Sequence, residues 1–180
     1  MKILEKIAHE YPQIVKEMRS AAISAGAKIM DVYSGDDFGV QIKDDDSPVT
    51  LADKIADKAI GDILEVEFPN VPIVSEESHC NLNSAMGEIY FLVDPLDGTK
   101  EFIKKTGEFT VNIALILNEK AEFGVVYVPV TGELYYRDLD GASYLERGVD
   151  GAVSRSGRAK ISCREADLVN LSVVKFVSHT

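Results

Sequence analysis

Apolar positions in the first third of the chain recur with helical spacing. Within residues 1–31 they return at intervals of three and four on either side of Pro12, a residue that is tolerated in the first turn of a helix and disruptive later. The core-facing positions expected of this helix are Ile14, Val15, Met18, Ala21, Ala22, Ala25 and Ile29. A second helix is expected to begin at Thr50, which forms a capping-box pattern with Asp53, and to end at Phe68.

Short apolar runs of strand character fill most of the remaining sequence. Ile89–Val93 is rich in β-branched and aromatic residues and carries no charge, which is typical of a strand covered on both faces. Residues 148–159 are predicted to form a flexible loop. Further strands are expected at 40–43, 71–74, 109–117, 121–128, 133–136, 142–145, 161–163 and 171–177. Their short links favour an antiparallel meander, so the sequence predicts a single α+β domain over residues 1–180, with two N-terminal helices packed on a largely antiparallel sheet.

Composition and charge restrict the possible partners. The 180 residues are 46% hydrophobic and 27% charged, as in soluble globular proteins, and their formal net charge is −11. This charge argues against binding a nucleic-acid polymer or an anionic membrane, and a phosphorylated small molecule would need a bridging cation. The sequence has no apolar run long enough to span a membrane and no signal-peptide pattern, so a cytoplasmic location is expected, with Cys80 and Cys163 reduced.

The candidate chemistry lies directly after the apolar run at 89–93. In the sequence D-P-L-D-G, Pro95 forces Asp94 into an extended conformation and Gly98 permits a backbone geometry that other residues resist, so the carboxylates of Asp94 and Asp97 can converge. Converging carboxylates repel unless a cation lies between them, and oxygen ligands of this kind suit Mg²⁺. An acid pair, Glu76-Glu77, also ends the apolar run before it. The alternative is a plain turn, because Asp-Pro and Asp-Gly pairs are common in turns that bind nothing.

These motifs resemble those of a known group of enzymes. The pair Glu76-Glu77 and the stretch from Asp94 to Thr99 resemble the signature of the inositol monophosphatase-like, Li⁺-sensitive, Mg²⁺-dependent phosphatases. The sequence of residues 47–53, 94–103 and 107–116 resembles that of 3'(2'),5'-bisphosphate nucleotidases of the CysQ type. The likeness runs from about Ala21 to the end, and it implies the N-terminal domain of the inositol monophosphatase/sugar phosphatase fold.

The resemblance assigns a role to each residue of the motif. It implies that Mg²⁺ is the cofactor, held by the side chains of Glu76, Asp94 and Asp97 and the carbonyl of Leu96. Glu76 would also help to activate a water molecule, which the hydroxyl of Thr99 would orient with Asp53 behind it. The substrate phosphate would lie against Leu96, Asp97, Gly98 and Thr99, with the amides of the last two facing its oxygens. From the residues alone, Asp53 is also an N-terminal helix acid stabilised by the helix dipole, an interpretation compatible with the first, and the alternative for Thr99 is an ordinary turn or helix-cap threonine.

The implied reaction is removal of the 3'-phosphate of 3'-phosphoadenosine 5'-phosphate, a step of sulfur metabolism that gives AMP and phosphate. An inositol phosphate is the alternative substrate, and a non-catalytic domain that assembles with itself or with a missing half is the alternative from another class. The sequence contains no tryptophan, so the later W-D-x-A-A-G segment of the family, and with it the C-terminal α/β domain, is expected to be absent. Apolar surface exposed by this absence would favour a dimer or a higher assembly, with the region 171–177 protected.

Overall fold

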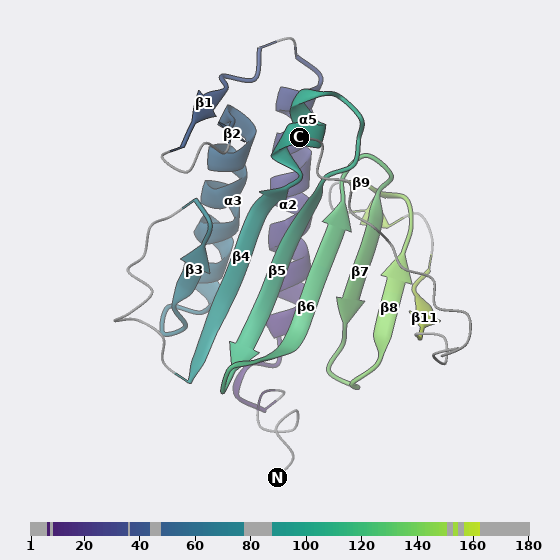
Figure 1. Cartoon of the computed structure of the whole chain (residues 1–180). Helices are drawn as coiled ribbons and strands as arrows, with labels where there is room; N and C mark the ends of the chain where they lie inside the picture. Colours follow the sequence, from purple (N-terminus) through teal and green to yellow (C-terminus); the bar gives the residue numbers. More distant parts are fainter. Residues whose placement is uncertain are drawn as a thin grey trace, which may run out of the picture.

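Two helices cover one face of a twisted sheet. The computed structural model describes residues 7, 9–35, 37–43, 48–77, 88–150, 153–154 and 157–162. Helices α2 (Ile14–Tyr33) and α3 (Leu51–Glu67) pack against each other and lie together behind the sheet, while the short helix α5 (Thr99–Ile103) follows the strand at the centre of the site (Figure 1). The α+β prediction is confirmed.

Within the described residues, the sheet has seven strands in the order β11-β8-β7-β6-β5-β4-β3. Every neighbouring pair is antiparallel except β3 and β4, which run parallel. The strands are β3 (Ile73–Ser75), β4 (Ile89–Asp97), β5 (Thr110–Leu117), β6 (Lys120–Val128), β7 (Glu133–Arg137), β8 (Ser143–Glu146) and β11 (Ala159–Ile161). The meander predicted from 109 to 145 is therefore confirmed to within one or two residues at each end. In the described part of the chain, β1 (Gln41–Ile42) and β2 (Pro48–Val49) pair outside this sheet, and so do β9 (Val149–Asp150) and β10 (Val153–Ser154).

The helix starts follow the sequence signals, with one shift. Thr50 is the N-cap of α3: its hydroxyl accepts a hydrogen bond from the Ala52 amide, and its own amide donates to Asp53 Oδ2 at 2.7 Å, so the capping box is confirmed. Helix α2 begins at Ile14, and Pro12 precedes its N-cap Gln13 rather than lying inside the first turn. A backbone bond from the Ile14 amide to the Tyr11 carbonyl closes a turn around Pro12, which completes the approach to the helix without a proline amide.

An aromatic cluster anchors the segment that follows β4. Phe102 of α5 is fully buried, and its ring lies 5.0 Å from that of Phe38 and 5.3 Å from that of Phe109. Tyr33, at the end of α2, closes the cluster at 5.2 Å from Phe102. Burying a phenylalanine contributes roughly 1.5–3 kcal/mol, so this contact holds the turn before α5 in place.

Three predictions about the strands were wrong. Among the described residues, strand β4 is covered on one face only, because α2 and α3 lie on the same side of the sheet (Figure 1): Phe91 and Val93 are buried, whereas Leu92 is 45% exposed. The strand also does not break at Asp94 but continues to Asp97 through a register shift against β5. The region 148–159 is not a loop throughout, because β9, β10 and the first residue of β11 lie in it and pair with neighbouring chain.

Other predictions shift or fall outside the described residues. The strand expected at 40–43 is shorter, because β1 contains only Gln41 and Ile42, which pair antiparallel with β2. The strand expected at 161–163 begins earlier, at Ala159, and its partner is β8. The strand expected at 171–177 lies outside the described residues, as do Cys80 and Cys163. In the part of the chain that the structure describes, none of the helices has the length and apolar character needed to cross a membrane.

Helix α2 approaches the sheet closely at Gly26, which yields a stability prediction. Gly26→Ala should lower the free energy of unfolding, because a Cβ atom there would lie 2.3 Å from the ring of Tyr127, and that ring is fixed by a hydrogen bond from its hydroxyl to the Val149 carbonyl. Overpacking of this kind costs about 1–3 kcal/mol, which exceeds the gain of about 1 kcal/mol in helix propensity. Urea denaturation would measure the difference.

Gly61→Ala on α3 is the matched control for this substitution. A Cβ atom at Gly61 meets only the Glu65 carboxylate, at 3.9 Å, so this variant should gain up to about 1 kcal/mol. Stabilisation of both variants would contradict the close packing of α2 on the sheet.

Candidate functional site

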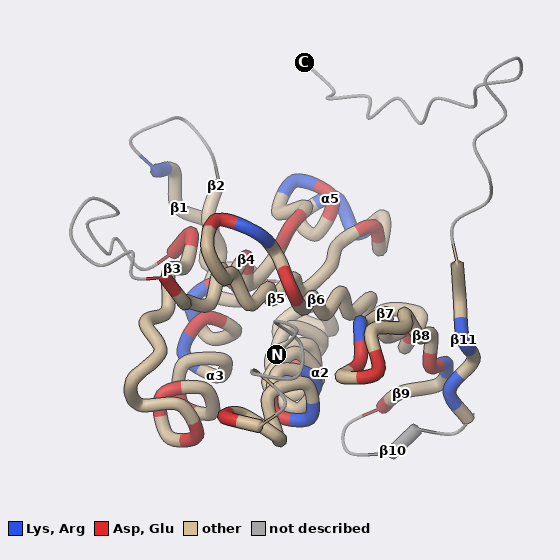
Figure 2. The backbone as a smooth tube through the Cα atoms, turned by 90° about the horizontal axis from the view of Figure 1, so that it is seen from below, with Lys and Arg blue, Asp and Glu red and all other residues tan. Residues whose placement is uncertain are grey.

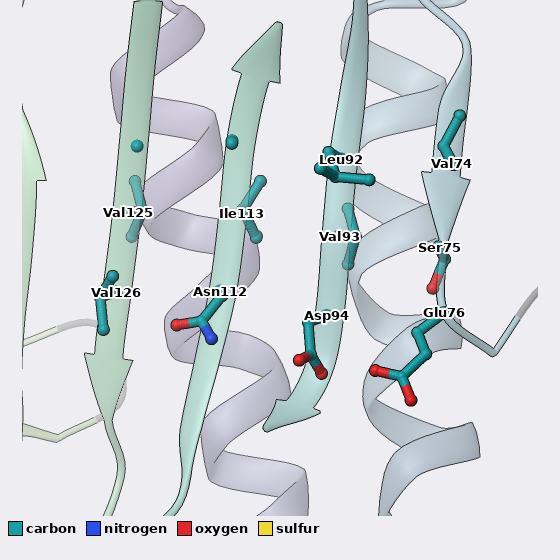
Figure 3. Close-up of a pocket in the computed structure, with 12 residues that line it drawn as sticks. Val74, Ser75, Glu76, Leu92, Val93, Asp94, Asn112, Ile113, Val125 and Val126 are labelled. Carbon is teal, nitrogen blue, oxygen red and sulfur yellow. The ribbon is translucent and has the colours of Figure 1, made fainter. Parts of the chain in front are cut away.

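The parallel pairing of β3 with β4 brings the predicted acids together. Ser75 pairs with Val93, and the Glu76 amide donates a hydrogen bond to the Val93 carbonyl at 3.1 Å. Glu76, which follows β3, and Asp94, which lies within β4, are therefore neighbours at the same end of this strand pair, and Figure 3 shows their carboxylates at about the same level. The sequence prediction that these two acids share a site agrees with this arrangement.

The register shift in β4 sets the direction of the second acid of the motif. Asp94 pairs with Asn112 and Asp97 with Thr110, so the two residues between the acids, Pro95 and Leu96, form the irregular stretch. Leu96 is buried, and Asp97 is exposed and accepts a hydrogen bond from Asn112 Nδ2 at 3.2 Å. Asn112 was not predicted as a site residue, although it lies in the motif stretch 107–116.

Gly98 ends the strand in a conformation that requires glycine. Its φ is +96°, and a Cβ atom there would lie 2.7 Å from the Glu108 carbonyl oxygen. The next residue, Thr99, begins α5 and turns its hydroxyl toward Asp53 Oδ1 at 3.1 Å and toward the Leu96 carbonyl at 3.3 Å. The predicted pairing of Thr99 with Asp53 is thus present in the structure.

Asp53 makes the helix-cap contacts and the contact with Thr99, the two compatible arrangements that the sequence suggested. Its Oδ2 accepts hydrogen bonds from the amide and the hydroxyl of Thr50, at 2.7 and 2.5 Å, and so completes the helix cap. Its Oδ1 accepts from Thr99, on the other side of the site. Since Asp53 is only 2% exposed, these bonds replace the water that the carboxylate has lost.

Asp94 is the most strongly perturbed group of the site. Burial raises the pKa of its carboxyl to about 7, and the negative charges of Glu76, Asp97 and Asp53 act in the same direction, opposed by a backbone hydrogen bond from Leu96. Within the described part of the chain its Oδ1 atom is buried and has no hydrogen-bond partner. A half-buried carboxylate of this kind is stabilised by a cation placed between it and its acidic neighbours.

Lys43 is the cation that the sequence analysis missed. Its Nζ lies 2.6 Å from Glu77 Oε1 and 3.4 Å from Glu76 Oε1, so it joins the β1 segment to both acids at the end of β3. Burial acts to lower the pKa of Lys43, but the hydrogen bond and charge of Glu77, together with Glu76, raise it above its ordinary value. Nothing in the sequence links residue 43 with residues 76 and 77, because the contact depends on the tertiary fold.

The donor set fits a hard divalent cation as an open site. Carboxylate and carbonyl oxygens are the ligands that Mg²⁺ takes, and the unpartnered Asp94 oxygen is available to one. Among the described residues, however, no group of three or more His, Cys, Asp or Glu side chains is gathered closely enough to hold a metal ion. Glu76 accepts a hydrogen bond from Lys43, and Asp97 accepts one from Asn112, so filling the site would require these two carboxylates to change partners.

An apolar groove of about 490 Å³ extends from the acids along the open face of the sheet. At one end it is lined by Glu76, Asp94, Asn112 and Val126, and farther along by residues such as Val74 and Leu92 (Figure 3). Leu92 and Val126 are 45% and 38% exposed, so water covers apolar side chains here. Exposed apolar surface beside a polar site is characteristic of a binding or docking surface.

Comparison with known proteins assigns this arrangement to a family. The sequence pattern of the inositol monophosphatase family matches residues 10–179. Among curated proteins, the chain is 46% identical over 125 residues to the 3'(2'),5'-bisphosphate nucleotidase CysQ of Salmonella typhimurium, which covers 68% of this chain and 51% of the relative. It is 51% identical over 116 residues to CysQ of Escherichia coli strain K12, covering 63% of this chain and 47% of the relative.

The structural comparison gives the same result. The crystal structure of CysQ from Bacteroides thetaiotaomicron superimposes with a TM-score of 0.71 at 36% identity, over 87% of this chain and 60% of that one. The chain thus spans about half the length of the two curated relatives. Because the family pattern covers almost the whole of it and the fold agrees, this chain belongs to the inositol monophosphatase family.

Proposed function

We propose that this chain takes part in Mg²⁺-dependent hydrolysis of a phosphate monoester, the 3'-phosphate of 3'-phosphoadenosine 5'-phosphate, to give AMP and phosphate. The observation that carries the proposal is Asp94, whose raised pKa and unpartnered oxygen mark a place for a cation beside the Thr99–Asp53 pair. The substrate follows from relatives named 3'(2'),5'-bisphosphate nucleotidase. The reaction would belong to sulfur metabolism and take place in the cytoplasm.

Charge explains why a cation is needed. The chain carries 30 acidic against 19 basic residues, and Lys and Arg alternate with Asp and Glu over several elements (Figure 2). A phosphate ester approaching Glu76, Asp94 and Asp97 would be repelled by all three. Mg²⁺ bound by these side chains and the Leu96 carbonyl would neutralise charge on the phosphate and make a bound water acidic near neutral pH.

The residues around the cation would divide the remaining work. Thr99 has one hydroxyl proton, and donating it to Asp53 leaves the oxygen lone pairs free to accept a hydrogen bond from the attacking water. The side chain of Glu76 is 56% exposed. Once its bond to Lys43 is broken, this carboxylate can accept a proton from the attacking water. Gly98 has no side chain to block a phosphate oxygen from the nearby amides.

Two other activities remain to be separated from this one. An inositol phosphate is the second candidate substrate, favoured by the family pattern itself. A non-catalytic role is the third, favoured by the described residues, which gather no group of three or more metal-ligating side chains. Phosphate release with and without Mg²⁺ separates an enzyme from a binding domain, and comparing the two substrates under identical conditions separates the chemistries.

Asp94→Asn should lower the rate of Mg²⁺-dependent phosphate release by more than about 100-fold, because it removes a charged ligand.

The same substitution should stabilise the metal-free protein at alkaline pH. Since the folded-state pKa is raised from 3.8 to about 7, the wild type loses stability as pH rises through this window, and asparagine, which carries no charge, does not. Denaturation at pH 5 and pH 8 would give the free energy of unfolding of both proteins. The same pH dependence in the two would contradict the raised pKa of Asp94.

Thr99→Ala should lower kcat on the order of 100-fold while leaving the Mg²⁺ concentration for half-maximal activity nearly unchanged, because Thr99 orients water and does not bind the cation. Thr99→Ser keeps the hydroxyl and serves as the control, with most of the activity retained. If Thr99→Ala weakens Mg²⁺ binding as much as it slows turnover, Thr99 belongs to the metal site instead.

The open sheet face leads to a prediction about assembly. We propose that a second copy of the chain covers the groove along Leu92 and Val126, so light scattering should give at least twice the mass of one chain. Leu92→Lys should shift the protein toward the monomer, whereas Val66→Lys, at an exposed apolar position on α3, should not. A wild-type monomer at high concentration would overturn the proposal. Protection of 171–177 remains a separate prediction.

A further inference from the structure

Asp57 is a second acid on the face of α3 that already carries Asp53. The two residues are four apart, so their side chains lie one above the other on the helix. Asp53 contacts Thr99, just after β4, and Asp57 Oδ1 accepts a hydrogen bond from Ser75 Oγ at 2.5 Å, at the end of β3. One face of α3 therefore reaches the two strand ends from which the site is built.

Ser75 transmits this contact to Glu76. It is 8% exposed, and its Oγ, while donating to Asp57, also accepts a hydrogen bond from the Glu77 amide at 3.4 Å. The Glu76 amide is bound in turn to the Val93 carbonyl. The backbone is therefore held before, at and after Glu76, which fixes the point from which its side chain extends toward Asp94 (Figure 3).

The cost of this arrangement indicates a function beyond helix stability. Like charges four residues apart on a helix repel each other, so an acid at position 57 beside Asp53 weakens α3 on its own. The repulsion is offset because hydroxyl groups of neighbouring segments donate to both acids, Thr50 and Thr99 to one and Ser75 to the other. The half-buried Asp57 is thus used in a tertiary contact at the site rather than as a solvated surface charge.

We propose that Asp57 is a positioning residue, which acts through Ser75 to hold Glu76 in place for the cation and the attacking water. Its effect on turnover rests on the proposed function, whereas its effect on the backbone at 73–77 does not. Asp57→Ala removes the acceptor, and Asp57→Asn keeps an oxygen acceptor without the charge. Ser75→Ala breaks the same bond from the other side and leaves no unpaired hydroxyl, which covers the case in which Asp57→Ala does not fold.

The first measurement is amide hydrogen exchange of the full chain without metal. Asp57→Ala and Ser75→Ala should speed exchange at residues 73–77 by at least about tenfold, with Asp57→Asn close to wild type. Asp62→Ala is the matched control, because Asp62 is an exposed acid on the same helix that pairs, among the described residues, with Lys58 at 2.6 Å. This variant should leave exchange at 73–77 unchanged. Unchanged exchange in both bond-breaking variants, or an equal increase in the control, would overturn the proposal.

The second measurement is Mg²⁺-dependent phosphate release. Asp57→Ala should raise the Mg²⁺ concentration for half-maximal activity about tenfold and lower kcat, with KM for the nucleotide little changed and with rescue by Asp57→Asn. A uniform loss in all variants including Asp62→Ala would overturn it. If the wild type releases no phosphate at any Mg²⁺ concentration, the proposed function fails, and the exchange result alone then decides for or against Asp57.

Discussion

Mutual repulsion among carboxylates is the physical constraint that shapes the site end of this molecule. The parallel pairing of β3 with β4 places Glu76 beside Asp94, and the irregular end of β4 adds Asp97. Such crowding persists in a folded protein only when the surrounding structure holds it, because each acid would otherwise turn into solvent. The aromatic cluster around Phe102 and the bonds from α3 supply that support.

Support and chemistry therefore come from different parts of the chain. The acids stand at the ends of β3 and β4, where ligands can approach, while Asp53 and Asp57 belong to α3, which lies behind the sheet (Figure 1). Asp53 illustrates the division, since one of its oxygens completes a helix cap and the other holds Thr99. A single buried carboxylate thus makes the start of α3 and the start of α5 depend on each other.

Local signals made much of this predictable from the sequence. The capping box at Thr50 and the spacing of apolar residues in α2 both act within a few residues, so they can be recognised without the fold. The partners of the acids could not be found this way. Lys43 meets Glu77 across 34 positions and Ser75 meets Asp57 across 18, and no local pattern encodes such contacts. The run at 89–93 misled for a related reason, because an apolar strand shows how much surface it can bury but not which elements will cover it.

The exposed face of β4 links the fold to the acid cluster. Leu92 and Val126 point away from the helices, and the groove beside them ends at the acids. Exposed apolar groups that meet a charged site lower the cost of excluding water when a second surface closes over them, and electrostatic attraction in the closed site becomes stronger as water leaves. Without a cation, the repulsion between Asp94 and its acidic neighbours would then become more costly. With Mg²⁺ bound, the attraction between the cation and these carboxylates would become larger. Cover of the sheet face and occupation of the acid cluster should therefore favour each other, so an assembly that buries Leu92 should bind the cation more tightly than the isolated chain.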